Sequence, residues 1–349
     1  MRSGNAMGRF FKRNKLKRAA QSLASVLVTL LLLVTLTFFL GQVMPVDVVS
    51  RLVGPDADQA TYQATYERLG LDQPIIVQFG IYISRMVQGD FGTALLTGHQ
   101  VLDDIIRVFP ATVELGTLAL LIGAGIGVPL GVLAAVQRNR SADHIIRIVT
   151  LLGHSVPIFW IGLMGLLLFY SYLGWVGGGG RVEIYYEGLV ETRTGLLLVD
   201  SLLAGDTEVF WSAVRHIILP ATVLGYASMA SLCRLTRSFM IDQLSQEYIT
   251  AARVKGVSEW NVVWHHAFRN IRVQLLTVIA LTYGSMLEGA VLIETIFAWP
   301  GFGQYLTNNL LLGDMNAIMV CVLLVGVIFI TLNMLADLLY KIFDPRTVQ

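Results

Sequence analysis

Two carboxylates inside an apolar stretch near the C-terminal end are the residues most able to do chemistry. Glu288 lies deep in this stretch, and Glu294 lies closer to its end. A carboxylate in hydrocarbon costs about 2.5 kcal/mol or more unless it meets a partner or a water-filled path. Glu288 is therefore a candidate for the lining of such a path, where it could meet a substrate amine. The alternative is an interhelical hydrogen bond or a protonated structural carboxyl. For Glu294 we expect hydrogen bonding near the turn at Pro300 and Gly301.

The other reactive side chains form no catalytic or metal-binding pattern. His265 and His266 are adjacent, so on a helix they point about 100° apart and cannot easily share one ion. Cys233 and Cys321 lie in apolar stretches and predict neither a disulfide framework nor a thiolate zinc site. The sequence has no H-E-x-x-H pair, no G-x-S-x-G elbow and no G-x-x-x-x-G-K-S/T phosphate loop. We therefore expect no enzyme activity, no metal and no cofactor in this chain.

The composition indicates that lipid surrounds most of the chain. Hydrophobic residues make up 55% of the sequence and charged residues 14%, whereas soluble domains are roughly 25% charged. A helix needs about 20 apolar residues to cross the hydrocarbon layer. Pro157 and Pro220 are expected near the starts of the third and fourth helices, where a missing backbone hydrogen bond costs least. We predict an all-α integral membrane protein with six transmembrane helices, at Ala19–Val43, Ala111–Val136, Ile148–Leu173, Ile217–Leu235, Val273–Phe297 and Met315–Ile342.

Lysine and arginine are distributed unevenly between the two sides of this arrangement. Seven of them lie in the basic segment 1–18, and every lysine falls on the same side as that segment. The positive-inside rule then places both termini in the cytoplasm. The opposite side holds residues 44–110, for which short interfacial helices are expected, and Gly174–His216, which opens with a flexible turn at Gly177–Gly180.

Glycines punctuate the second predicted span. Small residues of this kind usually let a neighbouring helix approach closely. We therefore favour a packing role over a role in a substrate path for Gly123, Gly125, Gly127 and Gly131.

The segment of about 242–272, between the fourth and fifth spans, is unusually structured for a cytoplasmic connection. It suggests two short helices broken at Gly256, which tolerates the left-handed backbone of a tight reversal. Ser258 can cap the second helix. Such a helix-turn-helix can press into a groove on a soluble partner, or its apolar stripe can lie on the lipid surface. Spacing alone leaves both readings open, and the expected apolar face comprises Trp260, Val263, Trp264, Ala267 and Phe268.

The pattern Glu247-x₃-Ala251-Ala252-x₃-Gly256, followed by His266 and Asn270, resembles the coupling-loop signature of bacterial ABC importer permeases, in particular the dipeptide/oligopeptide/nickel family. Segments along nearly the whole chain resemble that family in the same order. They are Leu69–Pro74, Gly89–Gly92, Phe109–Thr112, Ser155–Phe159, His216–Pro220, Glu294–Gly303 and Asp344–Arg346.

The resemblance implies that the loop docks into a cleft of a separate ATP-hydrolysing subunit. The matching positions are Glu247, Ala251, Ala252, Gly256, His266 and Asn270. By the same resemblance, 111–349 is the permease core, and the last external turn carries Glu294, Pro300, Gly301 and Gly303. ATP would be bound by the partner subunit, so this chain would need no cofactor of its own.

The resemblance also implies partners and a location. These are a second homologous permease, one or two ABC ATPase subunits and a periplasmic or extracellular substrate-binding protein, with lipid around the chain and no nucleic acid. The location implied is the bacterial inner membrane. The expected cargo is di- or oligopeptides, and the alternatives are nickel chelates, glutathione or another small solute.

Two other classes of protein fit less well. An ion-coupled secondary carrier would usually show inverted repeats with broken helices and has no use for a coupling loop. An intramembrane protease would need catalytic motifs or paired intramembrane aspartates, which are absent from this sequence.

Overall fold

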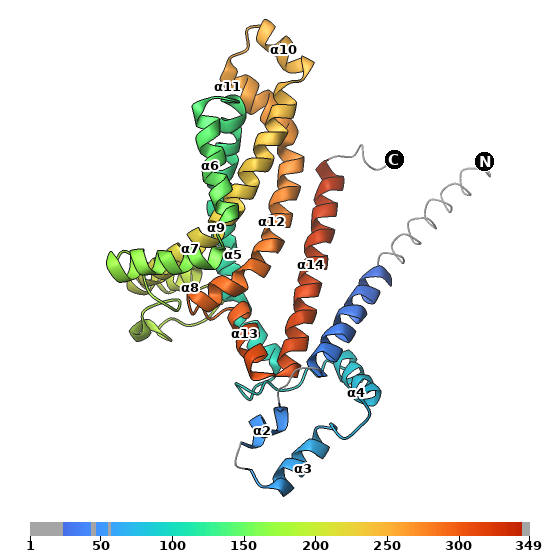
Figure 1. The fold of residues 1–349 in the computed structure, drawn as a ribbon. Coiled ribbons are helices and arrows are strands. Elements are labelled where there is room, and N and C mark those ends of the chain that lie inside the picture. Colours follow the sequence, from blue (N-terminus) through green and yellow to red (C-terminus); the bar gives the residue numbers. More distant parts are fainter. Residues whose placement is uncertain (1–23, 43–46, 55–56, 344–349) are drawn as a thin grey trace, which may run out of the picture. The chain divides into compact units, whose positions relative to one another are not determined.

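A computed structural model describes residues 24–42, 47–54 and 57–343, and these residues form helices joined by loops, without a β-strand (Figure 1). The chain divides into two compact units. Unit 1 comprises Met1–Asp104 and Asn308–Thr331, and unit 2 comprises Ile105–Thr307 and Leu332–Gln349. The basic segment 1–18 and the tail after residue 343 lie outside the described residues.

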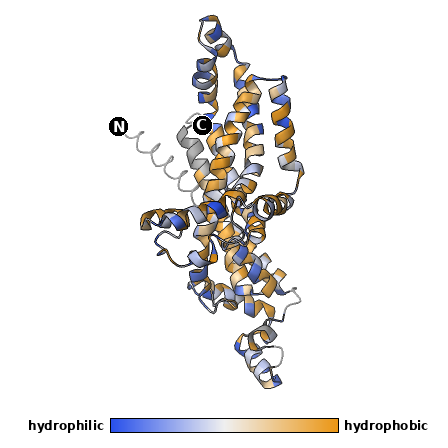
Figure 2. Cartoon of the chain, turned by 90° about the vertical axis from the view of Figure 1, so that its left-hand side faces the viewer, coloured by the Kyte–Doolittle hydropathy of each residue, from blue (hydrophilic) through white to orange (hydrophobic). Residues whose placement is uncertain are grey.

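Five helices of the described chain are long and apolar enough to cross a membrane. A bent pair of helices makes a sixth candidate span. Figure 2 shows hydrophobic residues spread along these helices, as lipid contact requires. The predicted all-α membrane fold is confirmed. The five continuous spans are Ala24–Gln42, Val101–Val136 (α5), Thr207–Leu244 (α9), Glu259–Ile296 and Met315–Leu335, the last belonging to α14 (Met315–Phe343).

The third span is not the single helix predicted over Ile148–Leu173. It consists of α6 (Ser141–Ser155) and α7 (Ile158–Gly165), which continues as a π-helical turn at Leu166–Tyr172. The two helices are bent by 94° at the break between them. Val156 is extended there, with φ −93° and ψ 128°. Pro157 follows it, and the ring of a proline disfavours helical backbone in the preceding residue, which explains the break.

Two further helices begin earlier than predicted. α5 starts at Val101 and carries Pro110 inside it. α9 starts at Thr207, so Pro220 lies well inside the helix and not near its start. Asp206 caps α9, because its carboxylate accepts hydrogen bonds from the N–H groups of the second and third helical residues. This cap lets a helix begin in the polar segment that hydropathy had assigned to the loop.

The core of unit 2 lies where α5, α9 and α12 (Phe268–Ile296) pack together. α9 is the central helix, with 72% of its most apolar window buried. Gly123, Gly127 and Gly131 of α5 face it. An added Cβ would lie 2.6 Å from the Met229 carbonyl oxygen at Gly127 and 2.6 Å from the Cys233 carbonyl oxygen at Gly131. The packing role is confirmed for these three glycines, whereas an added Cβ at Gly125 would have no atom within 4 Å.

Unit 1 contains the first membrane helix and the short helices expected in the segment 44–110. Phe38 of the first membrane helix contacts Phe79 of α4 (Ile75–Val87), with ring centroids 5.2 Å apart. Asp314 is buried and accepts a hydrogen bond from the Leu95 N–H at 2.5 Å, which ties this segment to the start of α14. The short helices are α2 (Val48–Val53), α3 (Gln59–Arg68) and α4 (Ile75–Val87).

The remaining short elements lie in the loops or, for α11 and the π-helical turn that follows it, at the start of the fifth span. They are a 3₁₀ turn (Ile184–Tyr186), α8 (Leu197–Ala204), α10 (Glu247–Val254), α11 (Glu259–Asn261), a π-helical turn (Val262–Ala267) and α13 (Phe302–Leu312).

Candidate functional site

The loop between α9 and α12 carries the predicted reversal at Gly256. Gly256 has φ +78°, in the left-handed region that glycine adopts most easily. Its N–H donates to the Arg253 carbonyl at 3.0 Å, and the Val257 N–H donates to the Ala252 carbonyl at 3.2 Å. These two bonds form a Schellman motif, which satisfies the carbonyls at the end of α10. The break predicted at Gly256 is confirmed.

The segment after the turn is not a separate second helix. α11, the π-helical turn and α12 follow one another without a break, so this segment is the first part of the fifth span. Ser258 occupies the N-cap position, but its hydroxyl makes no cap hydrogen bond; its backbone carbonyl accepts from the Val262 N–H at 2.9 Å. The loop therefore consists of one separate helix, α10, and an N-terminal extension of α12.

The apolar face of this extension differs from the predicted one. Val263 and Ala267 are buried as expected, but Trp260 is 71% exposed. The buried set also includes Val262 and Ile271. A π-helical turn holds more residues per turn than an α-helix, so it rotates the side chains that follow it relative to the spacing assumed for an α-helix. The face of this extension that packs on the ends of α5 and α9 therefore includes Val262 and Ile271 and leaves out Trp260.

α10 has one face packed on its own chain and one face exposed. Ile249 and Ala252 are buried in a cluster with Val132 of α5 and Met240 of α9. Exposed positions on the other side include Glu247, Ala251 and Gly256. The residues of the recognised motif are thus divided between the two faces.

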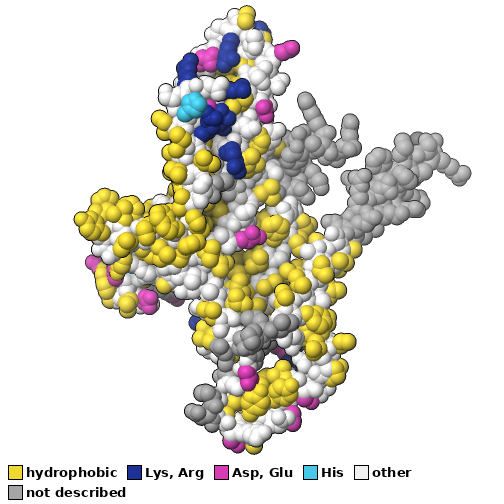
Figure 3. All heavy atoms as spheres, viewed as in Figure 1, with side chains coloured by type: hydrophobic (Ala, Val, Ile, Leu, Met, Phe, Trp, Pro, Cys, Tyr) yellow, Lys and Arg dark blue, Asp and Glu magenta, His cyan; other side chains and the backbone are white. Residues whose placement is uncertain are grey.

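Polar contacts hold α10 against the start of α12. The Asn270 side-chain amide donates to the Tyr248 hydroxyl at 2.8 Å. Arg253 and Glu259 form an ion pair across the Gly256 turn, with an Nε to Oε1 distance of 2.8 Å. Asn270 of the motif therefore links α10 to α12 through an exposed contact, and His266, four residues before it, is half-buried. Figure 3 shows lysine and arginine side chains gathered over the end of unit 2 that carries α10.

The turn after α12, which the sequence predicts to be the last external turn, encloses Glu294. Its side chain is fully buried, accepts a hydrogen bond from the Thr112 hydroxyl at 2.5 Å and accepts another from the Gln304 N–H at 3.0 Å. The hydrogen bonding expected near this turn is confirmed. A Cβ at Gly301 would lie 2.5 Å from the Glu294 carboxyl carbon, and one at Gly303 would lie 2.5 Å from the Val291 Cα. Both positions therefore need glycine.

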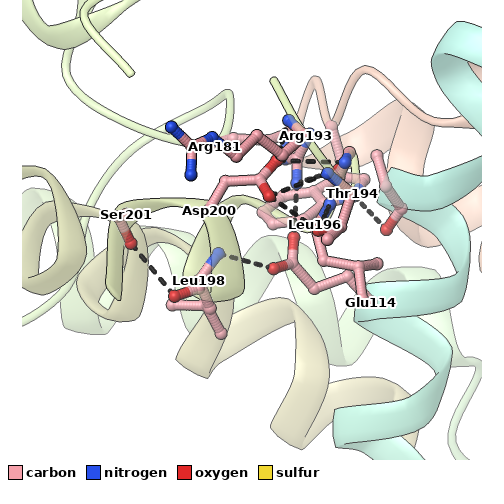
Figure 4. Close-up of polar contacts among 11 residues, drawn as sticks. Glu114, Arg181, Arg193, Thr194, Leu196, Leu198, Asp200 and Ser201 are labelled. Carbon is pink, nitrogen blue, oxygen red and sulfur yellow. Dashed lines mark hydrogen bonds and ion pairs between the residues drawn. The ribbon is translucent and has the colours of Figure 1, made fainter. Parts of the chain in front are cut away.

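A second buried carboxylate network orders the segment after α7 (Figure 4). Arg181 Nη2 lies 2.5 Å from Glu114 Oε2, and its guanidinium lies 5.7 Å from the centre of a Trp299 ring. Glu114 Oε1 also accepts from the Leu198 N–H at 2.8 Å. This pair was not predicted from the sequence, where its signal was a carboxylate in an otherwise apolar span and an arginine just after the glycine run.

Asp200 closes a loop within the same segment. It accepts hydrogen bonds from the Thr194 hydroxyl and N–H, and from the N–H groups of Arg193 and Gly195. Burial by itself would raise the pKa of Asp200, but these hydrogen bonds hold the pKa below its ordinary value. The carboxylate is therefore the stable form, and it organises the start of α8.

The glycine run Gly177–Gly180 is packed and is not the flexible turn predicted. A Cβ at Gly177 would lie 2.4 Å from the His216 ring, and one at Gly178 would lie 2.9 Å from the Tyr170 ring. The Gly177 N–H donates to the Arg215 carbonyl at 2.8 Å, and the Gly180 N–H donates to the Phe297 carbonyl at 3.0 Å. Glycine is needed here because the backbone passes close to neighbouring side chains.

Glu288 is exposed in this chain, in contrast to Glu294 on the same helix. Ser285 and Leu292, one turn before and one turn after it, are also exposed. The structure therefore separates the two carboxylates of the fifth span. Glu294 is committed to the last external turn, and Glu288 lies on a face of α12 that this chain leaves uncovered.

Comparison with known proteins agrees with this architecture. Residues 127–349 match the family described as binding-protein-dependent transport system inner membrane component, and residues 15–116 match its N-terminal membrane component. The chain is 41% identical over 311 residues to the probable D,D-dipeptide transport system permease protein DdpB of Escherichia coli (strain K12), covering 89% of this chain and 91% of the relative. It is 39% identical over 328 residues to the di/tripeptide transport system permease protein DppB of Pseudomonas aeruginosa (strain UCBPP-PA14), covering 94% and 97%.

A third relative is the dipeptide transport system permease protein DppB of Escherichia coli (strain K12), 37% identical over 326 residues that cover 93% of this chain and 96% of the relative. The family models together span almost the whole chain. The multi-pass helical fold and these matches agree, and the chain belongs to the inner membrane components of binding-protein-dependent transport systems, the permease subunits of ABC importers.

Proposed function

We propose that this chain forms half of the translocation path of an ATP-driven importer of di- or oligopeptides. The choice of cargo is supported by the relatives at 37–41% identity, which are named for transport of D,D-dipeptides, di/tripeptides and dipeptides. ATP is hydrolysed by a separate subunit, in keeping with the absence of a phosphate loop from this sequence.

The single observation that carries the coupling mechanism is the two-faced packing of α10. Ile249 and Ala252 bind α10 to the ends of the membrane helices, while Ala251 and Gly256 stay exposed for a partner. A protein that moves α10 therefore also moves α9 and α12, because the contacts between them are close-packed and transmit strain. ATP binding and release by the partner would in this way switch the path between its outward and inward states.

The remaining partners follow from the same proposal. A second homologous permease covers the face of α12 that carries Glu288, so that this carboxylate lines the path or the interface and avoids hydrocarbon. A substrate-binding protein docks on the segment 44–110, which the charge bias assigns to the side opposite the cytoplasm. Both termini are cytoplasmic, and the protein resides in the inner membrane.

The experiment compares Gly256→Val with Gly188→Val in a tagged chain purified from membranes in mild detergent. Both glycines have positive φ, +78° and +75°, and an added Cβ would have no atom within 4 Å at either site. Valine therefore strains the backbone equally at each position, by about 1–2 kcal/mol. Mass spectrometry is expected to find an ATPase at stoichiometric amounts with the native chain and with Gly188→Val, and much less of it with Gly256→Val.

Equal ATPase recovery from the two variants would show that α10 is not the site that couples the chain to the ATPase. Recovery of the native chain alone, without an ATPase or a second permease, would refute the importer assembly itself. Uptake of a labelled dipeptide by cells that carry the native complex tests the cargo separately, with a nickel chelate and glutathione as competitors. Competition by one of these compounds and none by unlabelled dipeptide would reject peptides as the cargo.

A further inference from the structure

A cavity of about 520 Å³ lies between α6 and α9 within unit 2. Its basic lining residues are His144 and Arg147 of α6 together with Arg234 and Arg237 of α9. The part of the lining further along α6 is apolar and includes Ile148 and Leu151. The cavity therefore combines a cationic end with a hydrophobic wall.

The cationic end is held in place by one buried carboxylate. Asp143 is fully buried, and Arg237 binds it through two hydrogen bonds of 2.7 and 2.8 Å. The Asn139 N–H donates to the same carboxylate at 2.9 Å, and Arg147 Nε lies 3.6 Å from it. Arg147 Nη2 also lies 2.6 Å from His144 Nδ1, which must accept this hydrogen bond because a guanidinium only donates.

The cavity keeps an excess of positive charge. Three arginines line it beside the one negative charge of Asp143, and its lining, as far as the structure describes the chain, contains no carboxylate. A ligand with an anionic group would therefore be attracted, and a peptide amine would be repelled. Figure 3 shows basic side chains and a histidine gathered on this end of unit 2, with hydrophobic side chains directly below them on the same face.

The hydrophobic wall distinguishes between anionic ligands. Ile148 is 61% exposed and Leu151 is 65% exposed in this chain, on a helix that belongs to a candidate membrane span. A free phosphate ion would use only the arginines and leave these side chains uncovered. A molecule with both an anionic head and hydrocarbon chains would use both parts of the cavity. Basic pockets between membrane helices on the cytoplasmic side are suited to acidic lipid headgroups.

We infer that this cavity binds an acidic phospholipid, with its phosphate at Arg147 and Arg234 and an acyl chain along Ile148 and Leu151. The inference rests on the proposed orientation, which puts this end of α6 and α9 in the cytoplasmic leaflet. A lipid there would bridge α6 and α9 in the half of unit 2 that also carries α10. It would thereby stabilise the helices to which the coupling loop is attached.

The test uses the purified importer complex in nanodiscs of equal parts phosphatidylglycerol and phosphatidylcholine, followed by mild detergent extraction and mass spectrometry of retained lipid. Arg147→Gln is compared with Arg138→Gln, which removes an exposed arginine that does not line the cavity. One arginine near a headgroup contributes about 1 kcal/mol, so Arg147→Gln is expected to retain about fivefold less phosphatidylglycerol. Arg147→Lys keeps the charge and is expected to retain nearly as much as the native chain, as is Arg138→Gln.

Two controls separate the outcomes. Recovery of the second permease and the ATPase with every variant verifies that the chain is folded and assembled. Leu151→Asn is expected to lower lipid retention while leaving the arginines in place. Equal retention of phosphatidylcholine and phosphatidylglycerol would overturn the inference. It would also be overturned if millimolar inorganic phosphate displaced the lipid and Leu151→Asn retained as much lipid as the native chain. That second result would assign the cavity to a free anion. A cavity protected by the partner permease, with no lipid retained, would also overturn it without affecting the proposed importer function.

Discussion

Glu294 shows how a carboxylate is accommodated in an apolar region of this protein. Its oxygens accept hydrogen bonds from the Thr112 hydroxyl and the Gln304 N–H, and the Thr112 oxygen in turn accepts from the Phe302 N–H at 2.8 Å. Thr112 is therefore a hydrogen-bond partner of both the Glu294 side chain and the Phe302 N–H, two groups that are buried away from water. Buried polar groups without such partners cost about 1–3 kcal/mol each.

Thr112→Val should therefore lower the stability of the purified chain by about 1–3 kcal/mol, because it leaves the Glu294 carboxylate and the Phe302 N–H without this partner. Thr277→Val is the matched control, since among the described residues the Thr277 hydroxyl bonds only to the Val273 carbonyl of its own helix. The measurement is the thermal unfolding midpoint in one detergent. Similar shifts for the two variants would contradict the role assigned to Thr112.

At the scale of the element, the contact of α5 with α9 depends on three glycines at four-residue spacing. The backbones approach so closely that the first carbon of a side chain would meet a carbonyl oxygen of the facing helix. Without a hydrophobic driving force between helices in lipid, such close packing is a main source of helix association. Gly125, which lies between Gly123 and Gly127 in the sequence, does not share this role, because it lies on another face of α5.

Gly127→Ala is expected to force α5 and α9 apart and to destabilise the chain by about 1–3 kcal/mol, as overpacking does in well-packed cores. Gly125→Ala makes the same chemical change two residues away, where the new methyl group meets open space. The unfolding midpoints and the yield of assembled complex measure the difference. A loss at Gly125 equal to that at Gly127 would show that helix propensity, and not the α5–α9 contact, governs these positions.

At the scale of the whole molecule, the functional question is which end of the helices faces the ATPase. Within unit 2, α10 lies in the connection between α9 and α12, whereas Arg181 and Asp200 lie in the connection between α7 and α9. The bias of lysine and arginine toward the α10 side predicts that this side is cytoplasmic. The two native cysteines, Cys233 and Cys321, are buried, so they give a low background for thiol labelling.

Single cysteines introduced at Thr250 and Glu187, both exposed, test this orientation. A membrane-impermeant maleimide applied to spheroplasts is expected to label Glu187→Cys, and to label Thr250→Cys only after the membrane is permeabilised. The reverse pattern would turn the chain over and place α10 outside the cell. That result would also exclude contact between α10 and a cytoplasmic ATPase.

The sequence by itself was sufficient for the membrane class, the approximate positions of the spans and the reversal at Gly256. These features are local: hydropathy depends on composition over about 20 residues, and a glycine turn depends on the backbone freedom of one residue. The break at Val156 and Pro157 also has a local cause, because proline restricts the backbone of the residue before it. It went unrecognised because the hydropathy of the stretch is continuous.

Only the tertiary structure decided which faces of these elements are used. Ala252 packs inward and Ala251 stays exposed because α10 lies on the ends of α5 and α9, which the spacing of the motif does not reveal. The pairs Glu114 with Arg181 and Asp143 with Arg237 join residues far apart in the chain, and each carboxylate is buried only because its partner arrives from another element. Such contacts depend on long-range packing, so no single segment of the sequence could specify them.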